Sequence, residues 1–328
     1  MNRQAAEKVA DALLYEGYIL YPYRRSALKN RQRWMFGILY PPEYQEVCAG
    51  TERATMHSEC LLRAGVDCKL EVRLRFLQAR VSPQDSESEG RTGERVESCE
   101  ECEERRIDLN MAVAHGSTAH IEFSFPGNGG GAPGENIAGT RCTVARHEIR
   151  GAIAVTAQTA GNKAFRLLID VTNQSSMPEG VRNRDKALLQ SLISAHLLLT
   201  VPGGEFVSLL DPPPEFQAAA AGCRNIGNFP VLAGEPEQRD MLLCSPILLY
   251  DYPQIAPESA GDFYDATEMD EMLTLRVMTL TDQEKNEIRR SDEHARNLLH
   301  RTEETAREQL QKTHGAIRSM RSLGEDHE

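Results

Sequence analysis

Basic residues are scarce in this 328-residue sequence: 37 lysines and arginines stand against 49 aspartates and glutamates, for a formal net charge of −12. A chain this acidic does not neutralise phosphates overall, so general nucleic-acid binding and electrostatic docking on an anionic membrane are disfavoured. Long apolar runs are also missing. The best candidate, Ala187–Val201, contains Gln190, Ser191, Ser194 and His196, and it is shorter than the roughly 20 apolar residues that cross a membrane. We therefore expect no membrane insertion.

The apolar core of a signal peptide is absent too, because Met1–Ala12 is charged and typical of a helix. This predicts a cytoplasmic protein whose eight cysteines are thiols rather than a disulfide framework. The sequence also lacks a G-x-S-x-G motif, a P-loop and a G-x-G-x-x-G after a strand. His196 lies on or beside an apolar face and is interpreted as a core histidine. We therefore favour a non-catalytic protein without a cofactor.

The residues that are present divide into three parts. Residues 1–33 combine an amphipathic helix with a basic, aromatic segment. Residues 34–181 alternate between apolar and polar positions and predict an antiparallel β-sandwich or barrel-like unit. An acidic stretch, residues 82–104, interrupts this unit and is expected to be a solvated insertion. The predicted strands are residues 34–40, 68–81, 119–125, 142–156 and 165–172.

Residues 182–328 predict a different kind of structure. Arg182–Thr200 has a wide apolar face and is predicted to be one long helix, ended by Pro202-Gly203-Gly204. Short apolar runs follow, and capping boxes then predict helices towards the C terminus. The predicted fold class is therefore α+β, with the β-rich unit followed by a mixed, mainly helical C-terminal half.

Two groups of residues have the composition of metal or redox sites. Cys99 and Cys102 form a CxxC pair, but a structural zinc site needs four ligands, and no second pair exists. The two glutamates between them oppose thiolate formation. His57, Glu59, Cys60 and Cys68 form the second group. In a strand, His57 and Glu59 face one side and Cys60 the other, which favours buried cysteines and a surface histidine.

Two segments of opposite charge are the strongest candidates for a binding function. The first is basic and aromatic, and such residues dominate protein interfaces. The second, Asp251–Glu271, is acidic and contains no lysine or arginine. Together they predict either an internal seam or a docking surface for a protein partner. The candidate residues are Tyr21, Tyr23, Arg24, Arg25, Lys29, Arg31, Trp34, Asp251, Glu258, Asp262, Asp265 and Glu268.

The acidic stretch leaves other interpretations open. Its carboxylates match the oxygen ligands that Ca²⁺ and Mg²⁺ prefer, with Asp262, Asp265 and Glu268 as candidates, although their spacing is not that of an EF-hand. Acidic residues at a helix N-terminus are also stabilised by the helix dipole alone. A metal-dependent enzyme or metal carrier using residues 251–271 is therefore the alternative function.

Four segments carry a resemblance to a known family: Leu13–Pro42, Ser194–Pro213, Ser245–Lys285 and His314–Ser319. In these segments the sequence resembles a family of uncharacterised bacterial proteins associated with gene clusters for uptake [NiFe]-hydrogenases. The resemblance implies an accessory role in assembly, maturation or structure, with a hydrogenase subunit or maturation factor as the partner. It implies no particular chemistry, because the family has none assigned.

Overall fold

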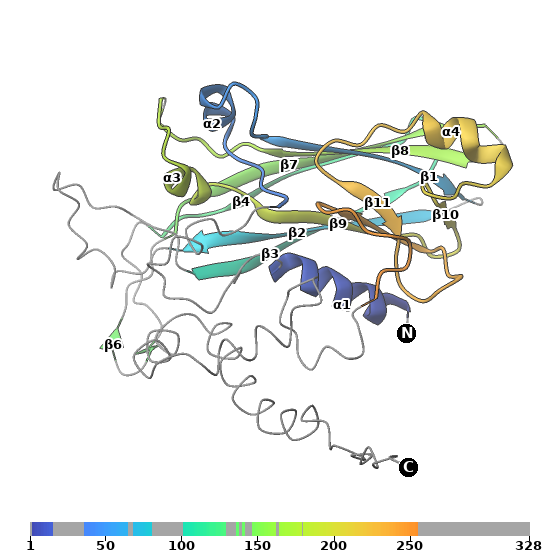
Figure 1. Cartoon of the computed structure of the whole chain (residues 1–328), viewed down its shortest axis with the longest axis horizontal. Coiled ribbons are helices and arrows are strands. Elements are labelled where there is room, and N and C mark those ends of the chain that lie inside the picture. Colours follow the sequence, from blue (N-terminus) through green and yellow to red (C-terminus); the bar gives the residue numbers. More distant parts are fainter. Residues whose placement is uncertain are drawn as a thin grey trace, which may run out of the picture.

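The computed structural model of the chain describes residues 2–15, 36–64, 68–80, 101–128, 136–137, 140–141, 146–161, 164–178 and 180–254. Two five-stranded antiparallel sheets dominate it and stack in two layers (Figure 1). Both sheets combine strands from distant parts of the sequence.

The first sheet has the strand order β10-β1-β8-β7-β4. Its central strands pair along most of their length, with His57 opposite Asp170 and Glu59 opposite Leu168. The bounds are β1 Thr55–Arg63, β4 Thr118–Phe125, β7 Ile149–Thr159, β8 Ala164–Asn173 and β10 Glu205–Val207.

The second sheet has the order β11-β12-β9-β2-β3. A separate two-stranded hairpin is formed by β5 (Asn136–Ile137) and β6 (Thr140–Arg141). The bounds in the second sheet are β2 Lys69–Arg80, β3 Glu101–Ala112, β9 Ile193–Thr200, β11 Phe229–Leu232 and β12 Met241–Ser245.

The main core lies between the sheets because each strand turns alternate apolar side chains inward. Cys60 and Leu62 of β1 lie in the same buried cluster as Leu74 and Phe76 of β2 and Leu197 of β9. An aromatic group closes one end of this core. It consists of Phe76, Phe123 and Phe125, with ring centroids 5.9 to 6.1 Å apart.

Helices cover parts of the outer faces. The predicted N-terminal helix is confirmed as α1 (Asn2–Tyr15), which lies along the second sheet (Figure 1). Its apolar face packs on Leu198 and Leu243, and its acidic face pairs with β2 through Asp11 and Arg75 (2.6 Å). The short helices are α2 Pro42–Val47, α3 Arg184–Leu188, the 3-10 helix η3 Pro214–Phe216 and α4 Gln217–Ala221.

The prediction of a mainly helical C-terminal half is wrong for the part that the structure describes, which ends at residue 254. The predicted helix 182–200 is the short α3 followed by the buried strand β9. β9 is apolar on both faces because Leu197 and Leu199 face the main core while Leu198 lies under α1. A strand buried on both faces has the continuous apolar sequence that also suits a buried helix.

The predicted insertion 82–104 also extends too far. Residues 81–100 lie outside the described residues, but Glu101–Glu104 begin the regular strand β3. Two of these carboxylates are paired with arginines: Glu103 with Arg80 and Glu104 with Arg75. The predicted strand 34–40 is likewise wrong in its described part, where Leu39 forms a single bridge with Leu192.

Candidate functional site

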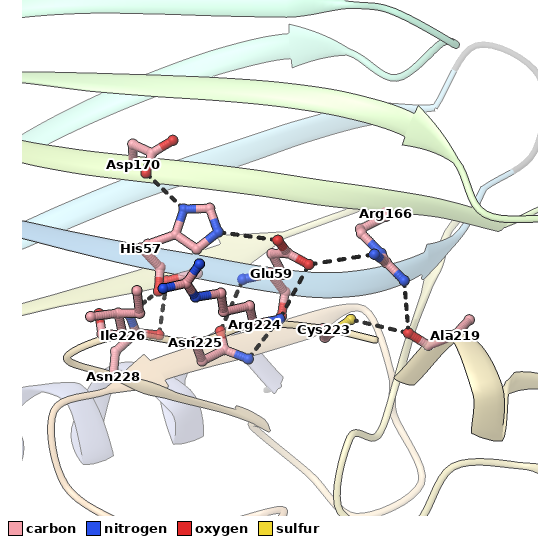
Figure 2. A network of polar contacts seen from close by, with 11 residues as sticks. His57, Glu59, Arg166, Asp170, Ala219, Cys223, Arg224, Asn225, Ile226 and Asn228 are labelled. Carbon is pink, nitrogen blue, oxygen red and sulfur yellow. Dashed lines mark hydrogen bonds and ion pairs between the residues drawn. The ribbon is translucent and has the colours of Figure 1, made fainter. Parts of the chain in front are cut away.

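The outer face of the first sheet carries a partly buried polar network, shown in Figure 2. His57 and Glu59 are two residues apart on β1 and therefore share one face of the strand. Register places Asp170 of β8 directly beside His57. This confirms the predicted facing of His57 and Glu59. Cys60 and Cys68 are buried, as predicted.

The His57 ring lies between two carboxylates. Its Nδ1 is 2.7 Å from Asp170 Oδ1, and its Nε2 is 3.2 Å from Glu59 Oε1. Ionised carboxylates only accept hydrogen bonds, so the ring satisfies both by donating from both nitrogens, as an imidazolium. Arg166 Nη1 lies 3.7 Å from the second oxygen of Glu59. The network thus contains two cations and two carboxylates.

The charge environment acts on the pKa of His57 in two directions. Partial burial lowers the pKa, whereas the hydrogen bonds to Asp170 and Glu59 raise it, and the net result lies above the ordinary 6.5. The two carboxylates favour the protonated form and occupy both ring nitrogens, so neither nitrogen is free to take a proton from a ligand. The arrangement therefore suits a structural role better than a catalytic one.

The network holds the loop Cys223–Asn228 against the edge of β1 (Figure 2). The Arg224 backbone N–H donates to Glu59 Oε2 (3.2 Å), and Asn225 exchanges two hydrogen bonds with the Glu59 backbone (2.9 and 3.2 Å). His57 and Ile226 exchange backbone hydrogen bonds of 3.0 and 2.8 Å. Asn228 continues the contact by donating to the His57 carbonyl (2.9 Å). These bonds fix the loop's position.

The fixed loop forms one wall of a cavity of about 520 Å³. The segment Phe36–Tyr40, Arg53 and Met56 also line it. This volume lies within the range of about 300–1,000 Å³ that small-molecule and peptide-anchor pockets occupy. Phe36 and Phe229 line it and are 39% and 42% exposed, which makes them available to a ligand or partner.

Gly37 marks the place where three distant segments meet beside this cavity. Its φ of +58° favours glycine, and an added Cβ would lie 2.8 Å from Pro246 Cβ and 3.1 Å from the Ala195 carbonyl oxygen. The Ala195 N–H donates to the Gly37 carbonyl (2.8 Å). Residues 37, 195 and 246 belong to three of the segments that carry the family resemblance.

The described lining of the cavity is suited to binding. It contains guanidinium groups (Arg53, Arg184) and aromatic rings, whereas the amides of Asn225 and Asn228 are engaged with β1. Among these residues no cysteine, histidine, serine or lysine occurs. Tyr40 accepts a hydrogen bond from Arg184 Nε (3.1 Å), and burial raises the pKa of its hydroxyl. A phenol with a raised pKa remains protonated and serves as a hydrogen-bonding group.

The cysteines near the network are unreactive in this environment. Burial raises the pKa of Cys223 to about 11 and that of Cys244 to about 12. Burial also raises the pKa of Cys60 well above its ordinary value. Because the thiolate is the reactive form, raised pKa values make these thiols weak nucleophiles. The prediction of free thiols is confirmed for Cys48, Cys60, Cys68, Cys223 and Cys244.

His196 is a core histidine, as predicted, although it lies on β9 rather than a helix. It is fully buried, and its Nδ1 hydrogen-bonds with the Ser194 carbonyl (2.9 Å). Its Nε2 has no hydrogen-bond partner in the described part of the chain. Burial, with a smaller contribution from Arg75, lowers the pKa of His196 to about 4.

The remaining candidate residues divide between described and undescribed positions. Asp251 braces the fold by accepting hydrogen bonds from Ser208 Oγ (2.5 Å) and the Leu232 N–H (2.8 Å). Cys102 lies in β3, and Cys99 lies outside the described residues. The other predicted binding or metal residues also lie outside them: Tyr21, Tyr23, Arg24, Arg25, Lys29, Arg31, Trp34, Glu258, Asp262, Asp265 and Glu268.

Neither a metal-holding group nor a membrane-spanning helix is found among the described residues. No group of three or more His, Cys, Asp or Glu side chains there is arranged to hold a metal ion. Within the same residues, every helix is too short or too polar to cross a membrane.

In the sequence, His57 and Glu59 form a candidate group with nearby cysteines, and nothing there connects them with Asp170 and Arg166. Their partners are more than 100 positions away, and a single strand pattern carries no signal of its neighbour's register. Asn225 and Asn228 were also missed, because polar residues in a Gly-containing loop are common.

Comparison of the sequence with protein-family models and with curated proteins gave no match.

Proposed function

We propose that this chain is a non-catalytic accessory protein of a [NiFe]-hydrogenase, acting in assembly, maturation or structure. In this proposal the cavity beside Gly37 receives a segment of a hydrogenase subunit or maturation factor. The observation that carries the proposal is the meeting of three resembling segments at this cavity, around residues 37, 195 and 246. Segments that lie far apart in the sequence would all keep the pattern of the family if together they formed one binding surface.

The exposed side chains near the cavity support a protein partner. Phe36 and Phe229 lie in its lining, and Leu248 and Tyr250 follow Pro246 with exposed fractions of 76% and 88%. Aromatic residues contribute strongly to binding energy when a partner buries them. The balanced His57 network supports the same interpretation, since it holds the cavity wall in place and its histidine is already engaged.

The proposal is tested by affinity purification from a strain that expresses the hydrogenase. We expect a hydrogenase subunit or maturation factor to co-purify with the wild-type chain, and Phe229→Ser to reduce its recovery. Leu210→Ser is the matched control, because Leu210 is 57% exposed and does not line the cavity. Failure to recover any such protein, together with unaltered hydrogenase activity in a deletion strain, would contradict the proposal.

A further inference from the structure

A second polar cluster closes the end of the core between the sheets, and among the side chains that the structure describes its charges do not balance. We call Arg80, Glu103, Arg105 and Arg146 the Glu103 cluster. Glu103 accepts from Arg80 Nη2 (2.5 Å), Arg105 Nη2 (2.9 Å) and Arg146 Nη1 (2.7 Å), all on one oxygen. Its other oxygen is 2.8 Å from Arg105 Nη1. Three guanidinium groups thus share one carboxylate.

The cluster is partly shielded from solvent, so water does not fully compensate its excess positive charge. Side-chain exposed fractions are 24%, 16% and 31% for Arg80, Arg105 and Arg146, and 27% for Glu103. Arg105 also stacks over the Phe125 ring, with its guanidinium carbon 4.8 Å from the ring centroid. Like charges in such surroundings repel one another more strongly than in water.

Arg146 has unused hydrogen-bonding capacity inside this cluster. Its Nη1 binds Glu103, whereas its Nε is buried and has no partner among the described residues. The backbone that carries it is fixed, since the Arg146 N–H donates to Asn128 Oδ1 (2.8 Å). Gly127 lies close to the same backbone, and only the lack of a side chain permits this: an added Cβ there would lie 2.9 Å from the Arg146 carbonyl oxygen.

From this geometry we propose that the Glu103 cluster binds one further oxyanion, a carboxylate or a phosphate group, with Arg146 as its main anchor. An oxyanion would accept from guanidinium N–H groups of the cluster, including the buried Arg146 Nε once that side chain turns towards it, and would neutralise part of the excess charge. Planar guanidinium groups bind both kinds of group in a two-pronged manner. The site is distinct from the cavity beside Gly37 and does not depend on the identity of the protein partner.

The test measures binding of inorganic phosphate and, separately, of succinate to the full chain at constant ionic strength. We expect at least one of them to raise the melting temperature saturably and to give a binding isotherm by calorimetry. Arg146→Lys keeps the charge but loses the planar edge, and should weaken binding about tenfold. Arg150→Lys is the matched control. Arg150 lies in β7, the strand that follows Arg146 in the sequence; its side chain is 60% exposed and paired only with Glu148 in the described structure.

The two probes distinguish the source of the oxyanion. Tighter binding of phosphate indicates a phosphorylated ligand, and tighter binding of succinate indicates a carboxylate ligand. The proposal is overturned if neither probe binds saturably or if Arg146→Lys binds as tightly as the wild type. Should Arg146→Lys fail to fold by circular dichroism, Arg80→Lys provides the same comparison at a second arginine of the cluster, which also binds Glu103.

Discussion

The His57 network and the Glu103 cluster are two partly buried polar groups with different charge balance. In the first, two cations face two carboxylates, and the carboxylate of Glu59 also accepts a loop N–H. In the second, three guanidinium groups face one carboxylate, and a buried Arg146 N–H has no described partner. In a balanced group each charge already has a counter-charge, whereas an unbalanced group leaves charge that an added anion can compensate.

The two groups also lie on different faces of the sheets. The His57 network lies on an outer face and joins a loop to a strand edge, so its bonds shape the cavity beside Gly37 (Figure 2). The Glu103 cluster lies where the inner face becomes polar, beyond the aromatic group of Phe76 and Phe125. The first region therefore positions the wall of the cavity, and the second is the oxyanion site that we propose.

The largest effect is expected from Glu59→Ala. This substitution leaves His57 and Arg166 without their shared carboxylate and releases the Arg224 N–H. Breaking such a buried pair costs about 3–5 kcal/mol of unfolding free energy, measured by urea denaturation. Glu205→Ala is the control, since Glu205 is 60% exposed and pairs with Arg63 at 3.9 Å; it should cost about 0–1 kcal/mol. Equal losses would refute the structural role of the network.

Glu103→Gln should have the next largest effect. It removes the one carboxylate among three guanidinium groups, and we expect a loss of about 2–3 kcal/mol, because the site is partly exposed. The variant should respond to the bound oxyanion more strongly than the wild type does, measured as the shift in melting temperature at a fixed concentration. A variant as stable as the wild type, with no added response, would show that the charge imbalance has no energetic consequence.

A smaller effect concerns the pH dependence of the His57 network. The unfolded chain releases the His57 proton near its ordinary pKa of 6.5, while the folded chain retains it to higher pH. The folded state therefore binds more protons in this interval, and stability falls as pH rises from about 6.5 through the raised pKa. His57→Gln should flatten that part of the unfolding free-energy profile. An unchanged slope would contradict the imidazolium assignment.

The smallest effect is expected from Arg150→Gln. Arg150 and Glu148 form an exposed pair at 2.9 Å, next in sequence to the Glu103 cluster. Solvent screens such a pair, so the unfolding free energy should equal that of the wild type within the error of the measurement. A larger loss, comparable with that of Glu103→Gln, would contradict the contrast between the exposed Arg150 and the partly buried arginines of the Glu103 cluster.

Sequence patterns predicted the regular parts of the sandwich. Alternation in β2 and the amphipathic pattern of α1 each reflect a single buried face, which local sequence reports directly. β9 was mistaken for a helix because α1 buries its second face, a tertiary fact. Glu103 was assigned to a solvated insertion for a similar reason: its neutralising arginines come from β2, β3 and the segment before β7.

The binding features were harder to predict than the strands. His57 and Glu59 were recognised as neighbours on one face, but Asp170 joins them only through strand register. The cavity depends on the meeting of residues 37, 195 and 246, and no local pattern reports such a meeting. The predicted basic and acidic segments, apart from Asp251, remain predictions.

The most direct test of the proposed accessory function is site-specific photo-crosslinking in cells that express the hydrogenase. A photoreactive amino acid at position 229, in the cavity lining, should crosslink the chain to a hydrogenase subunit or maturation factor. The same group at position 210, which is exposed but outside the lining, should not. The absence of such a crosslink from position 229, or equal crosslinking from both positions, would contradict the account.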